Sequence, residues 1–248
     1  MGSRHCLLVT GGGRGIGAAI VRLAAARGWD VCFSYLSDDA AAERLIAQTG
    51  SDGGRVRCLR GDVAEERFGA RFFAFAEDAL GPGTMLVNNA GITGPIGPFR
   101  ETSIETMRRT IDTNLLGPMM LAREAVRRWE ANGIPGRMVN ISSIASTLGA
   151  PHEYVHYAAT KAAVEALTIG LGKEVAAKGI RINAVAPGTT STDIHAAAGE
   201  PDRPARVAGK VPMGRIGDPT EIAEAVMWLL SDEASYVTAT VLRVSGGL

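Results

Sequence analysis

The chain of 248 residues contains only three cysteines, Cys6, Cys32 and Cys58. Their number is odd, no C-x-x-C spacing pairs them, and each lies in a short apolar run typical of a strand. A disulfide framework or a cysteine metal site is therefore not expected. We interpret all three side chains as parts of the hydrophobic core.

The chain also lacks a net charge and a long apolar run. Its 26 basic and 26 acidic residues balance, so no long-range field attracts nucleic acid or an anionic membrane surface. The segment from Met1 to His5 leads directly into a short apolar run, too brief for the apolar region of a signal peptide, and no run of about 18 apolar residues follows. We expect a cytoplasmic protein with no nucleic-acid partner and no membrane partner.

Apolar residues, by contrast, are abundant: the chain is 46% hydrophobic and 21% charged. This is enough for one large core, and no linker or repeat divides the chain, so we expect a single domain over residues 1–248. Strand-like runs alternate with helical patterns along the chain. The strand-like runs lie at 6–10, 31–35, 56–59, 85–87, 138–141, 182–185 and 241–244, and the helical patterns at 15–27, 39–48, 64–79, 103–129, 154–178 and 219–230. The alternation predicts an α/β fold, a doubly wound seven-stranded parallel sheet with helices on both faces.

One long irregular stretch, residues 188–218, is rich in glycine, proline and alanine. Long loops within compact domains are usually lids or binding loops. We expect this stretch to cover a substrate, although no role can be assigned to its charged residues or to His195.

The most informative turn is Thr10-Gly11-Gly12-Gly13-Arg14-Gly15-Ile16-Gly17, which follows the first predicted strand and opens the first predicted helix. A pyrophosphate can bind there to backbone N–H groups and to the positive end of the helix. A glycine cluster alone could be a flexible turn, but its place between strand and helix favours a dinucleotide site.

The T-G-x-x-x-G-x-G spacing of this turn differs from the common G-x-G-x-x-G. It resembles that of the short-chain dehydrogenase/reductase family, which has a Rossmann fold. The resemblance covers nearly the whole chain and includes Asp62-Val63, Asn88-Asn89-Ala90-Gly91, Asn114, Ser143, Tyr157, Lys161, Pro187-Gly188 and Val244-Ser245-Gly246-Gly247.

The resemblance implies a nicotinamide dinucleotide site at the carboxyl edge of the sheet. Asp62 and Val63 would hold the adenine, Asn89 to Gly91 would line the adenosine ribose, and residues 188–192 would contact the nicotinamide end. The expected cofactor-binding residues are Gly11, Arg14, Gly15, Ile16, Gly17, Ser37, Asp62, Val63, Asn89, Ala90, Gly91, Tyr157, Lys161, Pro187, Gly188, Thr190 and Thr192.

The end of the second predicted strand lacks the carboxylate that usually accepts from the ribose of NAD. Arg14 could instead pair with the 2′-phosphate of NADP, and Ser37 could donate a hydrogen bond to it. We therefore predict NADP(H). The alternative is NAD(H), with Asp38 reaching back to the ribose.

The segment HEYVHYAATK contains two motifs that indicate different enzymes. His152, Glu153 and His156 spell the zinc-protease signature H-E-x-x-H, which requires both histidines on one helix face. Gly149, Ala150 and Pro151 directly precede His152, so we expect His152 at or outside the helix start. A zinc hydrolase is therefore a remote alternative, and we predict no metal.

Tyr157 and Lys161 form the competing motif, Y-x-x-x-K. Lowering a tyrosine pKa from about 10 to about 7 requires roughly 4 kcal/mol, and an ammonium about 4 Å away supplies a similar amount. Residues four apart meet on one helix face, whereas Tyr154 stands seven residues before Lys161, so Tyr157 is the expected acid and Tyr154 is packing or a substrate wall.

The remaining catalytic roles follow from the family resemblance. Tyr157 would protonate the substrate oxygen as general acid, Ser143 would donate a hydrogen bond to that oxygen, and Lys161 would hold the nicotinamide ribose. Asn114 would anchor a water that links Lys161 to solvent. Ser142 is the other candidate for the hydroxyl that donates to the substrate oxygen. The family pattern favours Ser143, and Ser142 would be a structural residue at the strand end.

Two residues depart from the family pattern: Thr190 replaces a frequent isoleucine, and Ala239 replaces a frequent glycine. Neither change removes a catalytic group.

We expect an oxidoreductase that transfers a hydride between NADP(H) and the carbonyl or alcohol of a small molecule. The alternative is a dinucleotide-binding sensor or scaffold without turnover.

Small residues on the 154–178 helix favour close helix packing, and family members often pair their two long helices. We therefore predict a homotetramer.

Overall fold

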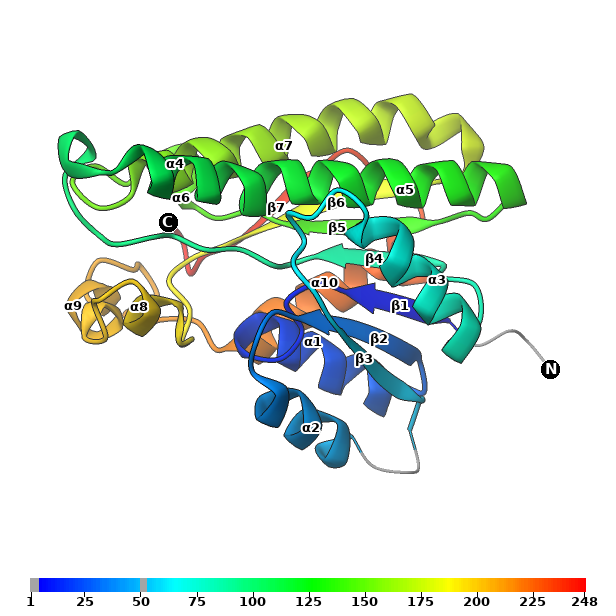
Figure 1. Ribbon diagram of the computed structural model, residues 1–248. Helices are drawn as coiled ribbons and strands as arrows, with labels where there is room; N and C mark the ends of the chain where they lie inside the picture. Colours follow the sequence, from blue (N-terminus) through cyan, green and yellow to red (C-terminus); the bar gives the residue numbers. More distant parts are fainter. Residues whose placement is uncertain (1–4, 50–52) are drawn as a thin grey trace.

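The computed structural model describes residues 5–49 and 53–248, so Met1 to Arg4 of the N-terminal segment lie outside the description. Seven parallel strands form one sheet in the order β3-β2-β1-β4-β5-β6-β7, with helices packed on both of its faces (Figure 1). The predicted doubly wound α/β fold is confirmed.

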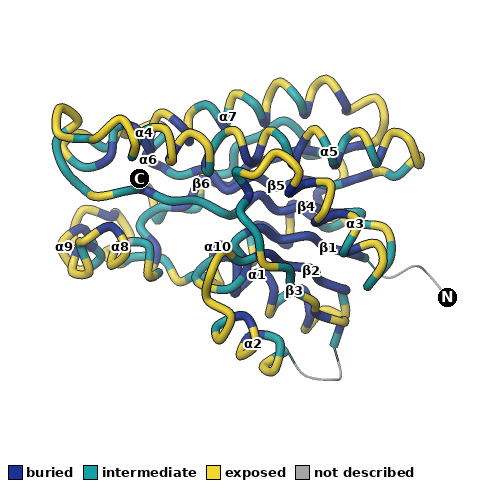
Figure 2. Tube along the Cα trace, viewed as in Figure 1, coloured by how far each residue is buried: buried dark blue, intermediate teal, exposed yellow. Residues whose placement is uncertain are grey.

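The strands agree with the predicted runs apart from shifts of one or two residues at their ends. They are β1 (Cys6–Val9), β2 (Asp30–Tyr35), β3 (Val56–Arg60), β4 (Met85–Asn88), β5 (Arg137–Ile141), β6 (Arg181–Pro187) and β7 (Val241–Val244). In the register of the sheet, Val9 of β1 lies beside Phe33 of β2 and Val87 of β4. Most strand residues are buried, as the tube in Figure 2 shows.

Successive strand side chains point to opposite faces of the sheet, so the chain builds two cores. Leu7 and Val9 belong to the core beneath α1 (Gly15–Ala26), α2 (Asp39–Gln48) and α10 (Pro219–Leu230). Cys6 and Leu8 belong to the core beneath α3 (Phe68–Leu80), α5 (Gly117–Asn132) and α7 (Val155–Val175).

The cysteines confirm the interpretation made from their context. Cys6 and Cys32 are buried in the second core, whereas Cys58 is partly buried against the first, and all three are free thiols.

The helix predicted at 103–129 is one continuous helical stretch with an interruption that the sequence analysis missed. It consists of α4 (Ile104–Ile111), the π-helical segment η2 (Asp112–Leu116) and α5. Pro118 has no N–H, so the carbonyl of Asn114, four residues earlier, cannot receive the usual α-helical hydrogen bond. The π-helical turn accommodates this missing hydrogen bond, so the helical stretch continues into α5.

Two further predictions need correction. The helix predicted from residue 64 begins only at Phe68, because the Asp62 carboxylate accepts from the Ala64 N–H and holds a turn there. The stretch 188–218 is not wholly irregular, because it contains α8 (Ile194–Ala197) and α9 (Arg203–Ala208). We call residues 188–218 the lid.

The remaining short elements lie at the ends of longer ones or between them. They are η1 (Phe99–Glu101), α6 (Ala145–Leu148), η3 (Ala176–Lys178), which continues α7, and η4 (Asp232–Ala234).

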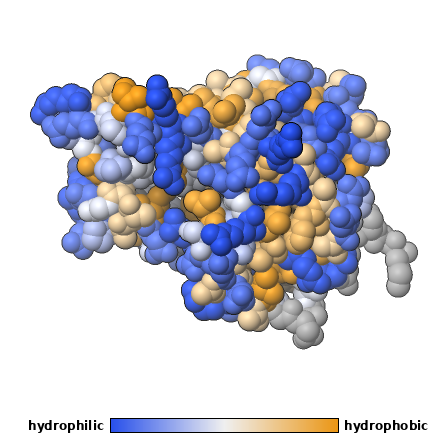
Figure 3. Space-filling view, viewed as in Figure 1, coloured by the Kyte–Doolittle hydropathy of each residue, from blue (hydrophilic) through white to orange (hydrophobic). Residues whose placement is uncertain are grey.

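Strand order reverses between β1 and β4, so the loops that follow these two strands diverge and leave a crevice at the carboxyl edge of the sheet. The lid lies at the same edge, at the left in Figure 1. The face seen in Figure 3 mixes hydrophilic and hydrophobic residues. None of the described helices is long and apolar enough to cross a membrane.

Candidate active site

The glycine turn joins β1 to α1 at the crevice. Gly11 has a φ of +62°, and a Cβ on it would lie 2.9 Å from the Cα atom of Ala90. The Asn89 side-chain amide donates hydrogen bonds of 3.0 Å to the carbonyls of Thr10 and Gly11. The Asn89 side chain therefore holds the turn after β1 against the loop after β4.

A cavity of about 620 Å³ runs from the glycine turn to the lid. It is lined by every predicted cofactor residue except Gly17, namely Gly11, Arg14, Gly15, Ile16, Ser37, Asp62, Val63, Asn89, Ala90, Gly91, Tyr157, Lys161, Pro187, Gly188, Thr190 and Thr192. Gly17 packs against the Gly11 carbonyl, where a Cβ would clash, so it sets the approach of helix to turn. The bare backbone at Gly11 and the N-terminus of α1 fit a dinucleotide pyrophosphate.

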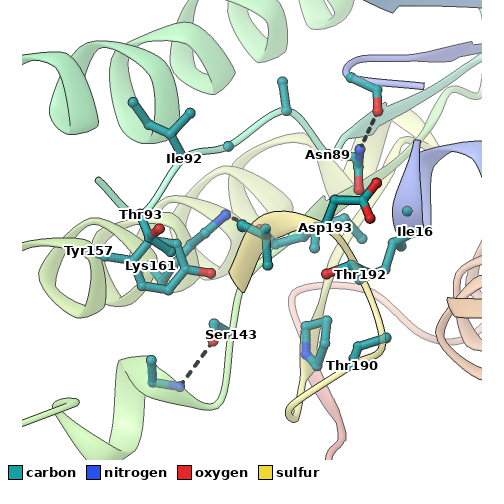
Figure 4. Close-up of a pocket in the computed structure, with 18 of the residues that line it drawn as sticks. Ile16, Asn89, Ile92, Thr93, Ser143, Tyr157, Lys161, Thr190, Thr192 and Asp193 are labelled. Atoms are coloured by element: carbon teal, nitrogen blue, oxygen red, sulfur yellow. Dashed lines mark hydrogen bonds between the residues drawn. The ribbon is translucent and has the colours of Figure 1, made fainter. Parts of the chain in front are cut away.

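Tyr157 and Lys161 lie one turn apart on α7 and reach the same cavity, as Figure 4 shows. Lys161 is 4% exposed, and its Nζ atom lies 5.6 Å from the centroid of the Tyr157 ring. That Nζ donates a 2.7 Å hydrogen bond to the carbonyl of Ile141 at the end of β5. Helix α7 is thereby tied to the sheet edge beside the serine loop.

Ser143 follows β5 and completes the cluster. Its hydroxyl hydrogen-bonds the Tyr157 phenol and accepts from the Ala145 N–H at 3.2 Å. Ser142, the competing serine, is 2% exposed, and its hydroxyl donates to the Glu165 carboxylate at 2.7 Å. Ser143 therefore lies next to the tyrosine, while Ser142 makes a structural contact.

Burial governs the ionisation of this cluster. It raises the pKa of Tyr157 to about 12, although the hydrogen bond from Ser143 acts in the opposite direction. It lowers the pKa of Lys161 to about 8. The expectation that Lys161 brings the Tyr157 pKa toward neutrality is wrong, because Nζ bonds a carbonyl rather than the phenol and burial penalises both charges.

Asn114 lies in η2, is fully buried and does not line the cavity. Its Oδ1 accepts from the Ile92 N–H at 2.8 Å, and its Nδ2 donates to the Ile92 carbonyl at 2.7 Å. A Cβ on Gly91 would meet Asn114 Oδ1 at 3.4 Å and Lys161 Nζ at 3.5 Å. Asn114 therefore holds the loop after β4 directly behind the lysine.

The end of the cavity beside β2 and the glycine turn, where the adenosine was expected, contains Arg14, Ser37 and Asp38. Arg14 is exposed, and among the described residues it forms no ion pair. The Asp38 carboxylate caps α2 by accepting from the Ala41 N–H at 2.9 Å. Asp38 is thus engaged with the backbone, whereas the Arg14 guanidinium is free.

The H-E-x-x-H residues do not form a metal site. His152 lies in the turn before α7 with a φ of +65°, which confirms that it precedes the helix. The His156 Nε2 atom lies 2.7 Å from the carbonyl oxygen of Thr93, and the Glu153 carboxylate pairs with Arg203. Across residues 5–49 and 53–248, no group of three or more His, Cys, Asp or Glu residues could hold a metal ion.

Tyr154, for which packing or a substrate wall was expected, is buried and lines the cavity. Its ring packs edge-on against the Tyr157 ring with centroids 5.2 Å apart, and the Arg203 guanidinium lies over the Tyr154 ring, 5.2 Å from its centroid. Thr190, which stands where the family often has isoleucine, lines the cavity. Ala239, which stands where the family often has glycine, has a φ of +57°, a conformation that favours glycine.

Sequence reasoning missed two side chains that organise this site. Glu165 accepts hydrogen bonds from Ser142 and from Ser146, at 2.7 and 2.6 Å, and so fixes the loop that carries Ser143. Its place four residues after Lys161 could have indicated it. Arg203 was left unassigned in the lid, and only its contacts show its place. The side chain of His195 lies outside the description.

Comparisons with known proteins agree with this geometry. Residues 11–248 match the family model described as Enoyl-(Acyl carrier protein) reductase. The chain is 43% identical to the uncharacterized oxidoreductase YgfF of Escherichia coli, over 97% of this chain and 98% of that protein. It is 38% identical to 3beta-hydroxysteroid dehydrogenase 1 of Eggerthella lenta, over 98% and 92%.

A third relative, L-rhamnose 1-dehydrogenase (NAD(P)(+)) of Sphingomonas, is 34% identical over 98% of this chain and 95% of its own length. Each similarity spans nearly the whole of both chains, and the same chain carries the glycine turn, the serine and the Tyr157–Lys161 pair at one sheet edge. The chain therefore belongs to the short-chain dehydrogenase/reductase family of oxidoreductases.

Proposed function

We propose that this protein is an NADP(H)-dependent oxidoreductase that interconverts a carbonyl and an alcohol of a small molecule. The observation that carries the proposal is the convergence of the Ser143 hydroxyl, the Tyr157 phenol and the Lys161 amine on the cavity that starts at the glycine turn. Relatives named for a hydroxysteroid and for a sugar support a small-molecule alcohol as the substrate class.

The residues for the cofactor are those that line the cavity along the sheet edge. Backbone N–H groups of the glycine turn hold the pyrophosphate, Asp62 and Val63 hold the adenine, and residues 188–192 hold the nicotinamide end. The bound cofactor supplies the hydride in reduction and accepts it in oxidation.

The protein's own contribution is to manage the proton at the substrate oxygen. Tyr157 donates its phenolic proton to that oxygen during reduction, and Ser143 donates a hydrogen bond to it. A pKa of about 12 keeps Tyr157 protonated at neutral pH, which suits a proton donor. In the reverse direction the phenol must first lose its proton, so oxidation benefits from higher pH.

Lys161 and Asn114 have supporting roles in this proposal. Lys161 holds the ribose hydroxyls near the nicotinamide, and its charge there favours the phenolate of Tyr157. Asn114 anchors a water that returns protons from solvent to Lys161. The close approach of Lys161 Nζ and Asn114 Oδ1 to Gly91 supports this relay.

The preference for NADP(H) over NAD(H) rests on Arg14. Its free guanidinium at the adenosine end can pair with a 2′-phosphate, and Ser37 can donate to the same group. The capping role of Asp38 in α2 argues against its use as an acceptor for the ribose of NAD.

We also propose a homotetramer. Ile104, Ile111 and Met119 are large apolar side chains exposed on α4 and α5, and Ile169 is exposed on the neighbouring α7. The outer face of α7 also exposes Ala162 and Ala166, which permit close approach of another helix. Static light scattering at micromolar concentration is expected to give four times the chain mass of 25.9 kDa, and a monomer would contradict the proposal.

The function is tested by measuring NADPH oxidation at neutral pH with a panel of ketones, diketones, keto-steroids and sugar lactones, and NADP⁺ reduction with the matching alcohols. Turnover of at least one pair in both directions is expected. Tight binding of NADPH without turnover of any compound would favour the alternative of a dinucleotide-binding sensor or scaffold.

A further inference from the structure

The cavity continues beyond Tyr157 into a substrate end between the start of α7 and the lid. Apolar side chains form most of its walls, among them Leu148, Tyr154, Val207 and Val211. One buried charge interrupts this surface: Arg203, the first residue of α9, is 8% exposed and lines the cavity.

The charge of Arg203 is matched by Glu153. The Arg203 Nη2 atom lies 2.6 Å from Glu153 Oε2, and its Nε atom lies 3.1 Å from the same oxygen. The two side chains are only 10% and 20% exposed. A buried guanidinium whose carboxylate partner is removed keeps an uncompensated charge, so the neutrality of this wall depends on Glu153.

The pair is held in place from both sides. The guanidinium of Arg203 lies 5.2 Å from the centroid of the Tyr154 ring, and the Glu153 carbonyl accepts from the Gly97 N–H at 2.8 Å. Arg206 contacts Glu153 at 3.5 Å and Glu200 at 3.4 Å at the exposed rim. The Gly97 contact thus fixes the backbone that carries the acid, and the Tyr154 ring lies against the guanidinium.

Outside the glycine-turn end and the Tyr157–Lys161 cluster, three other charged side chains line the cavity: Arg109 of α4, and Asp193 and Lys210 of the lid. All three are exposed, so solvent screens them. Arg203 is the buried cation of this part of the cavity among the described residues.

We infer that Glu153 neutralises Arg203 so that the substrate end accepts neutral carbonyl compounds and discriminates against anionic ones such as oxo acids. The inference rests on the proposed function, because it assigns the substrate class of the same site. It also gives the glutamate of the H-E-x-x-H segment a role as a specificity-determining residue rather than as part of a zinc site.

The reason is electrostatic. With Glu153 present, a carboxylate entering the apolar substrate end loses its hydration and gains no unpaired cation. With Glu153→Gln, the guanidinium keeps its full charge and its planar donors, which suit a carboxylate. Removing the acid is therefore expected to improve the binding of an anionic compound relative to a neutral compound of the same shape.

The test compares 4-acetylbenzoate with its methyl ester, a matched anionic and neutral ketone. Calorimetry gives the Kd of each compound for the NADP⁺-loaded protein, which cannot reduce a ketone, and NADPH absorbance gives kcat/KM. In Glu153→Gln the ratio of the acid Kd to the ester Kd is expected to fall about tenfold from its wild-type value, with the Kd of NADPH unchanged.

Matched variants separate this effect from damage to the lid. Glu200→Gln removes an acid at the exposed rim and is expected to leave the ratio unchanged, while Glu153→Gln combined with Arg203→Gln is expected to restore the wild-type ratio. An unchanged ratio in Glu153→Gln, or a ratio that the double variant does not restore, would overturn the inference. Because binding is measured apart from turnover, shifted Kd values without any NADPH oxidation would refute only the proposed function.

Discussion

The Nζ atom of Lys161 donates a 2.7 Å hydrogen bond to the carbonyl oxygen of Ile141. This contact joins α7 to the end of β5, directly before the loop that carries Ser143. It also places an amine in a buried site, where loss of hydration lowers its pKa from 10.5 to about 8. The burial of the Lys161 ammonium therefore lowers the free energy of unfolding.

The lowered pKa of Lys161 predicts a particular pH dependence of the free energy of unfolding. Between pH 8 and 10.5 the unfolded chain binds more protons at Lys161 than the folded protein does, so the contribution of Lys161 to stability rises with pH in this window. Relative to Lys161→Met, the free energy of unfolding of wild type is expected to improve by about 2 kcal/mol from pH 7 to pH 10.

Urea denaturation at a series of pH values measures this difference. The groups that titrate in both proteins, including the cysteines, cancel in the comparison. Lys173→Met, at an exposed position on the same helix, is expected to show no such trend. A difference between wild type and Lys161→Met that is flat or falls with pH would refute the account of Lys161.

Glu165 is expected to act as a positioning residue for Ser143. Glu165→Ala removes the acceptor shared by Ser142 and Ser146, so the serine loop loosens and kcat should fall about tenfold. The Kd of NADPH should not change, and Glu165→Gln, which keeps an acceptor oxygen, should recover most of the activity. Steady-state kinetics with Glu174→Ala, at an exposed site on α7, provides the control; an equal loss in both alanine variants would show that Glu165 has no special role.

Arg14→Gln is expected to weaken NADPH binding by about tenfold or more, because it removes a charge-assisted contact to the 2′-phosphate. Binding of NADH, which lacks that phosphate, should change little. Fluorescence titration with both cofactors measures the effect. Arg22→Gln, at an exposed position of α1 away from the cavity, should alter neither Kd. Tighter binding of NADH than NADPH by wild type would contradict the cofactor preference.

Ala239→Gly is expected to stabilise the protein by about 1 kcal/mol. Ala239 has a φ of +57°, which is unfavourable for a residue with a Cβ and free of that penalty for glycine. Ala74→Gly, at an exposed position within α3, should instead destabilise by about 1 kcal/mol. Thermal denaturation of the three proteins compares the effects, and a lower melting temperature for Ala239→Gly would contradict the strain.

The order of strands and helices, the glycine turn and the placement of Tyr157 beside Lys161 follow from local patterns. Period-2 runs predict strands, and a four-residue spacing on a helix predicts a shared face. The π-helical segment at Asn114 had a local signal as well, since Pro118 stands four residues later and removes a hydrogen-bond donor.

Other features could not be read from local sequence. Glu153 and Arg203 are 50 residues apart, and only the fold of the lid brings them together. The direction of the Tyr157 pKa was predicted wrongly because spacing shows that Lys161 is near but not how strongly burial acts on both groups. The lid helices α8 and α9 were missed because their segments are short and rich in residues typical of loops.

The central claim is that the Tyr157 phenol is the proton donor to the substrate oxygen. Its most direct test is single-turnover NADPH oxidation by wild type and Tyr157→Phe with the best carbonyl substrate. We predict that Tyr157→Phe binds NADPH with an unchanged Kd and reduces the carbonyl about a thousandfold more slowly. A Tyr157→Phe protein that keeps most of the wild-type rate would contradict the claim.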